Sequence, residues 1–218
     1  MTRTMNRTVV RRPRAQTDAA KPAPGPAAEV ERPALTRETW TDAATEVLVD
    51  QGIDHVRVDV LARGLGVTRG SFYWHFRDRE ELLRSVLQAW RELSTEQLTA
   101  RLASAHDDPR QQLRDVLSLP LRGRSAVRAA RIELAIRAWA RRDELARHAV
   151  DEADASRISY IAQVFSALGF AVAEARARAF LVYAFVVGES LMPGQGNTTQ
   201  RQDRGRLVEQ LLQQTLLR

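Results

Sequence analysis

Cysteine is absent from the chain of 218 residues, which excludes disulfide scaffolds, thiolate metal sites and cysteine nucleophiles. The four histidines are scattered and show no spacing typical of metal ligands. No apolar run approaches the roughly 18–20 residues of a membrane span, since the best one, residues 179–187, has about half that length. The N-terminus also lacks the apolar core of a secretory signal peptide. These absences favour a cytoplasmic protein without metal or cofactor.

Lysine is almost absent as well, and arginine supplies nearly all of the 33 basic residues. The net charge of +6 permits nucleic acid as a partner but does not establish it. Residues 1–34 carry seven basic and three acidic groups, whereas residues 35–83 carry six basic and nine acidic groups. Residues 84–218 carry 20 basic and 15 acidic groups. DNA binding through residues 35–83 would therefore need a local basic surface.

Residues 1–34 are predicted to form a disordered, basic and proline-rich arm. Five prolines break any helix there, and the apolar residues show no periodicity that would bury a face. Three interpretations stay open for this arm. It is a flexible tail, an incorrectly assigned start of the chain, or a basic segment that adds sequence-independent attraction for phosphates.

From residue 35 onward the spacing of apolar residues is helical, and no alternating strand pattern of convincing length is found. Thr36 is placed to cap the first helix, and Gly52 is placed to end it. Asp78 is placed to cap the fourth helix, with Glu81 three residues further on as in a capping box. The chain is therefore predicted to be all-α, with about nine helices.

Residues 53–79 contain two short helices separated by a tight turn at Gly66, which is the pattern of a helix-turn-helix unit. Glycine suits the left-handed backbone that such a turn needs. Ala62 is small enough to let the two helices cross closely. The predicted core of the unit consists of Leu61, Ala62, Leu65, Val67, Phe72 and Phe76.

The second short helix combines polar and aromatic side chains that a solvated face would not show together. The guanidinium fork of Arg69 matches guanine O6 and N7, and Ser71 is able to donate to a base edge or a phosphate. Tyr73 and His75 are able to donate to phosphate oxygens, which fixes register without reading sequence. Trp74 is interpreted as an interface contact or, alternatively, as part of a junction with the larger domain.

Two further residues of this helix favour DNA as the partner. Gly70 lets the backbone approach closely, and Thr68, as the N-cap, leaves the positive end of the helix free for phosphate. Between residues 61 and 79 four arginines outnumber a single acidic residue, Asp78. This excess supplies the local basic surface that the overall charge of residues 35–83 does not.

The segment from Thr36 to about Leu83 resembles the tetracycline-repressor (TetR) family of bacterial regulators. The resemblance rests on an Ala-Ala helix that ends Val47-Leu48-x-x-x-Gly52, on Leu61-Ala62-x-x-Leu65-Gly66-Val67-Thr68, on Gly70-Ser71-Phe72-Tyr73-Trp74-His75-Phe76 and on Arg79-Glu80-Glu81-Leu82. The resemblance implies that Arg69 and Ser71 read bases. It also implies that Tyr73 and His75 contact the DNA backbone.

One departure from the family concerns residue 57. The family usually begins its second helix with a serine or threonine cap near this position, whereas this chain has Arg57. The change would remove a cap and a phosphate contact, unless Arg57 itself reaches a phosphate. The predicted DNA-binding residues are Thr36, Arg57, Thr68, Arg69, Gly70, Ser71, Tyr73, Trp74, His75 and Arg79.

By the same resemblance, residues 35–83 form a helix-turn-helix DNA-binding domain and residues 84–218 form a ligand-binding and dimerisation domain. The run from Phe180 to Gly188 is apolar around its whole circumference, so a helix there needs cover on both sides. A second copy of the chain, together with the last helix, would complete a four-helix dimer contact. Burial within one chain is the alternative.

Ligand-contacting residues are left unassigned. Five aromatic residues of the second domain are interpreted as core rather than pocket lining, namely Trp90, Trp139, Tyr160, Phe165 and Tyr183. Arg131, Glu133 and Arg137 share one helix and are interpreted as a solvated face.

The sequence therefore predicts a homodimeric transcription factor, expected to be a repressor. It would bind double-stranded DNA at a pseudo-palindromic operator and be released by an unidentified small-molecule effector, with no membrane partner. The alternative is an all-helical ligand-binding protein with little or no specific DNA binding, which weak salt dependence would favour. An enzyme is not expected, because the chain shows no nucleophile–base arrangement, phosphate loop or metal cluster.

Overall fold

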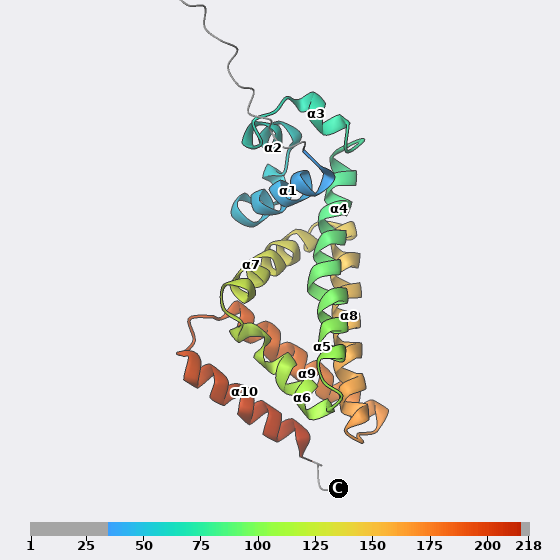
Figure 1. The fold of residues 1–218 in the computed structure, drawn as a ribbon, viewed down its shortest axis with the longest axis vertical. Helices are drawn as coiled ribbons and strands as arrows, with labels where there is room; N and C mark the ends of the chain where they lie inside the picture. Colours follow the sequence, from blue (N-terminus) through green and yellow to red (C-terminus); the bar gives the residue numbers. More distant parts are fainter. Residues whose placement is uncertain (1–34, 215–218) are drawn as a thin grey trace, which may run out of the picture. The chain divides into compact units, whose positions relative to one another are not determined.

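The structure of the protein is a computed structural model that describes residues 35–214 (Figure 1). The predicted basic arm of residues 1–34 lies outside the described residues, as do residues 215–218. All regular structure between residues 35 and 214 is helical, as predicted. None of the helices in this part of the chain is both long and apolar enough to cross a membrane.

The first half of the described chain contains five α-helices in the order of the sequence. Their bounds are α1 Arg37–Gln51, α2 Val58–Gly64, α3 Arg69–Tyr73, α4 Arg79–Arg91 and α5 Gln97–Ala105. A π-helical segment, Glu92–Glu96, joins α4 to α5 without a break in helical backbone. A short 3-10 turn at Ile53–His55 precedes α2.

The second half contains five further helices. Their bounds are α6 Pro109–Ser118, α7 Gly123–Ala140, α8 Glu144–Ala167, α9 Val172–Leu191 and α10 Thr198–Gln213. Counted with α4 and α5 as one continuous helix, the described residues hold nine helices, which agrees with the prediction. In Figure 1 the α4–α5 helix runs alongside α8, and the two are in contact.

Local capping explains several helix boundaries. The Thr36 hydroxyl accepts from the Thr39 amide at 3.3 Å and closes a capping box with that residue, and Gly52 ends α1 with a φ of 86°. Asp78 accepts from the Glu81 amide at 2.8 Å and starts α4. The expected capping box at this helix does not close, because the Glu81 carboxylate accepts from the backbone N–H of Arg77 instead of that of Asp78.

Two clusters of buried side chains form the core. The first joins Trp40 of α1 and Phe72 of α3 to α4, and it continues into Trp139 of α7 and Val150 of α8. The second lies between α6, α8 and α9 around Phe165. The predicted boundary between residues 83 and 84 falls inside α4, whose buried side chains belong to the same cluster as those of α7 and α8. The division into domains at that point stays a prediction.

Candidate nucleic-acid interface

The helix-turn-helix unit is built as its sequence predicts. Gly66 adopts a φ of 68°, and the Val67 amide donates to the Ala62 carbonyl at 2.9 Å across the turn. Phe72 is fully buried, with its ring edge-on to Trp40 at 5.3 Å and stacked on Phe76 at 5.4 Å. The inner face of α3 is therefore held by aromatic packing, and its opposite face points outward.

That outer face carries the aromatic side chains singled out in the sequence. Trp74 is 88% exposed and Tyr73 is 56% exposed, although both are large and partly apolar. Trp74 therefore does not pack into a junction with the rest of the described chain. Exposed aromatic neighbours on a short helix are the kind of patch that marks an interaction surface.

The other predicted contacts surround these aromatics. Thr68, Arg69 and Gly70 are exposed at the start of α3, and Ser71 and His75 are partly exposed. The Thr68 hydroxyl makes no capping hydrogen bond to α3, so it is not engaged in the helix that it precedes.

Arg57 and Arg79 have partners within the protein. Arg57 lies 3.3 Å from Asp59 in an exposed ion pair, and no side chain caps the start of α2. The family's usual cap at this position is thus missing, as the sequence indicates. Arg79 donates from Nε to the Val56 carbonyl at 2.5 Å and from Nη2 to the Ile53 carbonyl at 2.8 Å. It ties the start of α4 to the turn before α2.

Arg37, the first residue of α1, was not singled out by the sequence. Its guanidinium donates to the His75 carbonyl, to Glu81 at 3.0 Å and to Ser85 at 3.3 Å. The Cζ atom of Arg37 lies 4.2 Å from the centre of the Phe76 ring. The partners are far away in the chain, so no local pattern could have revealed the contact.

A polar cluster between α7, α8 and α9 corrects one prediction. Arg131 is exposed, as expected for a solvated face, but Glu133 and Arg137 point inward. Arg157 of α8 donates to both oxygens of Glu133 at 3.2 Å, and Arg137 donates to Asp154 at 3.0 Å.

Tyr183 of α9 completes this cluster. Its hydroxyl donates to Asp154 at 2.5 Å and accepts from Arg157 at 3.1 Å. Burial, helped by the hydrogen bond to Asp154, raises the pKa of Tyr183 to about 12. A signal existed in the sequence, since Asp154 and Arg157 occupy the apolar stripe of α8 between Val150 and Ile161.

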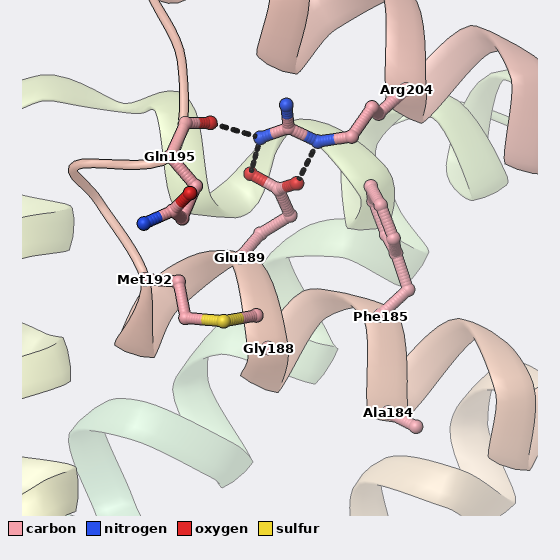
Figure 2. A pocket seen from close by; sticks show the side chains of 7 residues that line it. All are labelled: Ala184, Phe185, Gly188, Glu189, Met192, Gln195 and Arg204. Atoms are coloured by element: carbon pink, nitrogen blue, oxygen red, sulfur yellow. Dashed lines mark hydrogen bonds and ion pairs between the residues drawn. The ribbon is translucent and has the colours of Figure 1, made fainter.

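Two open hollows of moderate size lie outside the helix-turn-helix unit. One, of about 400 Å³, lies between α9 and α10 and is lined by Ala184, Phe185, Gly188, Glu189, Met192, Gln195 and Arg204 (Figure 2). Its only carboxylate, Glu189, is buried and accepts from Arg204 and Arg201, and these bonds, Arg204 first, lower the pKa of Glu189. Glu189 therefore joins α9 to α10, and its carboxylate is already paired with arginines of the protein.

The other hollow, of about 380 Å³, lies between α5 and α8. It is lined by Thr99, Ala100, Ala103, Ser156, Ser159, Tyr160 and Gln163. Trp90, Trp139 and Phe165 are buried in the core, as predicted, and they line neither hollow. The prediction was wrong for Tyr160, which lines the hollow between α5 and α8.

Apolar side chains of α9 and α10 are left uncovered in the single chain. Phe180 and Leu181 of α9 are 59% and 53% exposed, and Leu207 and Leu211 of α10 are each 54% exposed. The apolar run on α9 is therefore only partly buried within one chain, with Val182 covered and Phe180 and Leu181 left exposed.

A comparison with known families matches residues 41–86 to the family model described as bacterial regulatory proteins of the tetR family. This range includes α2, α3 and the start of α4. It therefore contains most of the candidate interface.

Named bacterial regulators match this chain over short stretches. An HTH-type transcriptional regulator, SrpR, from Pseudomonas putida is 49% identical over 61 residues, which cover 28% of this chain and 27% of the relative. A probable acrEF/envCD operon repressor from Escherichia coli K12 is 36% identical over 89 residues, 39% of each chain. The class D tetracycline repressor protein of Escherichia coli is 41% identical over 52 residues, 24% of each chain. The matches thus span well under half the length of these relatives.

Solved structures resemble the chain over a greater length. A TetR-family transcriptional regulator from Rhodococcus aligns with a TM-score of 0.63 at 21% identity, over 82% of this chain and 98% of the other. A transcriptional regulator from Saccharomonospora viridis, solved in complex with choline, aligns with a TM-score of 0.61 at 18% identity, over 81% and 92%. At these identities the likeness shows that the fold is shared.

Proposed function

We propose that this chain, a member of the TetR family of bacterial regulatory proteins through its residues 41–86, is a homodimeric repressor that reads a pseudo-palindromic DNA operator with α3. The observation that carries the proposal is the outer face of α3, where Tyr73 and Trp74 are exposed beside Arg69. Exposing two aromatic rings to solvent at the end of a five-residue helix is costly unless a partner covers them.

The roles of the individual side chains follow from their chemistry and their position on α3. Arg69 and Ser71 read base edges in the major groove. Tyr73 and His75 donate to phosphate oxygens, and Trp74 packs on the sugar-phosphate backbone or on thymine methyl groups.

The remaining contacts lie around α3. Gly70 permits close approach of the backbone, and Thr68 and Thr36 offer hydroxyls to phosphates. Arg79 adds positive charge near the DNA, because its hydrogen bonds to neutral carbonyls hold it beside α2. Arg57 would reach a phosphate by leaving its exposed ion pair with Asp59.

A second copy of the chain is the proposed cover for α9 and α10. Phe180, Leu181, Leu207 and Leu211 present an apolar surface that a twofold-related copy would bury in a four-helix contact. Such a dimer carries two copies of α3, which would enter successive major grooves about 34–36 Å apart.

Release by a small molecule is the proposed regulation. α4 begins directly after the DNA-reading unit, and its π-helical extension is joined to α8 through Arg157, which donates to Thr95 at 3.0 Å and to Ser94 at 3.1 Å. An effector that shifts α8 would therefore shift α4. By linkage, DNA must weaken the binding of such an effector by the same factor. Because its target is DNA, the protein is proposed to act in the cytoplasm.

Selection of bound sequences from a random duplex pool tests the proposal. We expect the purified protein to enrich one palindromic sequence with two half-sites, and its affinity for that duplex to fall steeply with added salt. Recovery of sequences without a shared motif would contradict the proposal.

A further inference from the structure

Tyr73, Trp74 and His75 of the proposed interface lie at the C-terminal end of α3, which is too short to fix their orientation by itself. α3 has five residues, which is fewer than two turns of about 3.6 residues each. Helices of this length are not stable alone in water, and their last carbonyls lack partners within the helix. The direction of Tyr73, Trp74 and His75 therefore depends on contacts made by other elements.

Arg37 of α1 makes the contacts that hold this end. Its Nη1 donates to the carbonyl of His75, two residues after the end of α3, while its Nη2 donates to Glu81 at 3.0 Å and to Ser85 at 3.3 Å on α4. The guanidinium also lies over the ring of the buried Phe76. One planar group thus joins α1, the end of α3 and α4.

Glu81 extends the same arrangement to the turn between α3 and α4. Its Oε2 accepts from the backbone N–H of Arg77 at 2.9 Å, while its Oε1 accepts from Arg37. The bond from Arg77 and that from Arg37 both lower the pKa of Glu81. The carboxylate is therefore ionised near neutral pH and holds the turn that carries the outer aromatics.

We propose that Arg37 is a positioning residue for DNA recognition, which fixes the direction of the C-terminal end of α3 so that its side chains match one DNA sequence. The inference rests on the proposed function. It differs from two simpler roles, in which Arg37 either contacts a phosphate directly or only stabilises the fold.

The experiment compares wild-type protein with Arg37→Met and Arg37→Lys. Each is titrated by fluorescence anisotropy against the duplex selected from the random pool and against a scrambled duplex of the same composition, at several salt concentrations. Helicity and thermal unfolding of each variant are recorded by circular dichroism. Arg84→Met is the matched control, because Arg84 is an arginine of α4 at similar exposure that pairs only with Glu80.

A positioning role predicts a loss of discrimination. Both Arg37 variants should bind the selected duplex about tenfold more weakly, because charge-assisted hydrogen bonds are lost, and bind the scrambled duplex almost as wild type does. The lysine variant should keep the wild-type salt slope. Arg84→Met should leave the ratio of the two affinities within about twofold of wild type.

Glu81→Gln gives an independent test, because the change in charge and the loss of positioning are expected to shift DNA affinity in opposite directions. Removing a negative charge beside DNA should tighten binding through charge alone. A positioning role predicts weaker binding of the selected duplex instead, because one amide oxygen cannot serve both Arg37 and Arg77. This variant decides the question if Arg37→Met does not fold.

Several outcomes would overturn the inference. Arg37 would be a phosphate contact if Arg37→Met bound both duplexes more weakly to the same extent, with a salt slope smaller by about 1. In that case Arg37→Lys should bind both duplexes as wild type does. Unchanged affinities with a lowered unfolding temperature would make it a stabilising residue only. If wild-type protein does not distinguish the two duplexes, the proposed function fails as well, whereas a wild-type preference that Arg37→Met retains removes the inference alone.

Discussion

Nε of Arg157 on α8 donates to the hydroxyl of Thr95, 3.0 Å away in the π-helical segment between α4 and α5. Thr95 is buried, and the same guanidinium reaches Glu133 of α7 and Tyr183 of α9. π-helical turns inside α-helices are frequent at functional sites. Through this contact the continuous α4–α5 helix, which begins next to the helix-turn-helix unit, is joined to α7, α8 and α9.

Thr95→Val should destabilise the protein. The substitution keeps the shape of the side chain but leaves the buried Nε of Arg157 without its acceptor, at a cost of about 1–3 kcal/mol in the free energy of unfolding. Thr99→Val is the control, because the Thr99 hydroxyl bonds only carbonyls of its own helix, and its effect should stay within about 0.5 kcal/mol. Urea unfolding at one protomer concentration measures both. Equal effects of the two substitutions would argue against a role for the Arg157 contact.

Arg69→Ala and Tyr73→Phe should differ in kind. Loss of the Arg69 fork should cost about 1–3 kcal/mol of binding free energy and relax the preference at one base position. Loss of the Tyr73 hydroxyl should lower the affinity for all DNA sequences by the same factor, because a phosphate contact carries no sequence information. Repeating the random-pool selection with each variant measures the difference. A uniform loss of affinity in Arg69→Ala would show that Arg69 does not read a base.

Leu211→Glu should convert the proposed dimer to single chains. The twofold relation places the new charge in the interface twice, so the dissociation constant should rise by about a hundredfold or more. Sedimentation equilibrium measures the change, and circular dichroism should show unchanged helicity. Leu93→Glu is the control, because Leu93 is 66% exposed but lies between α4 and α5. Dissociation by Leu93→Glu alone would place the dimer contact elsewhere.

Tyr183 should make stability fall in strongly alkaline solution. Its pKa of about 12 in the folded protein exceeds the value of 10.0 for a free tyrosine, so the folded state favours the protonated hydroxyl. The resulting contribution is fully present below pH 10 and is lost as the pH rises to 12, by an amount of about 2 kcal/mol. The difference in free energy of unfolding between wild type and Tyr183→Phe should therefore shrink between pH 10 and pH 12. A constant difference across that range would contradict the assignment.

Short-range patterns were sufficient for the elements and for the outline of the interface. Thr36, Gly52 and Asp78 mark helix ends because capping involves neighbours within a few residues. Gly66 and the buried Phe72 define the helix-turn-helix unit for the same reason. The exposed aromatics of α3 follow directly, since a helix that buries Phe72 must turn Tyr73 and Trp74 outward.

Only the tertiary structure decided which charged side chains meet. Arg79 bonds to carbonyls before α2, and Arg37 reaches the end of α3 from the start of α1. Glu133 and Arg137 of α7 face inward because they pair with Arg157 and Asp154 of α8. A charge costs too much to bury alone and little to leave in water, so its place depends on a partner that the folded chain brings from far away.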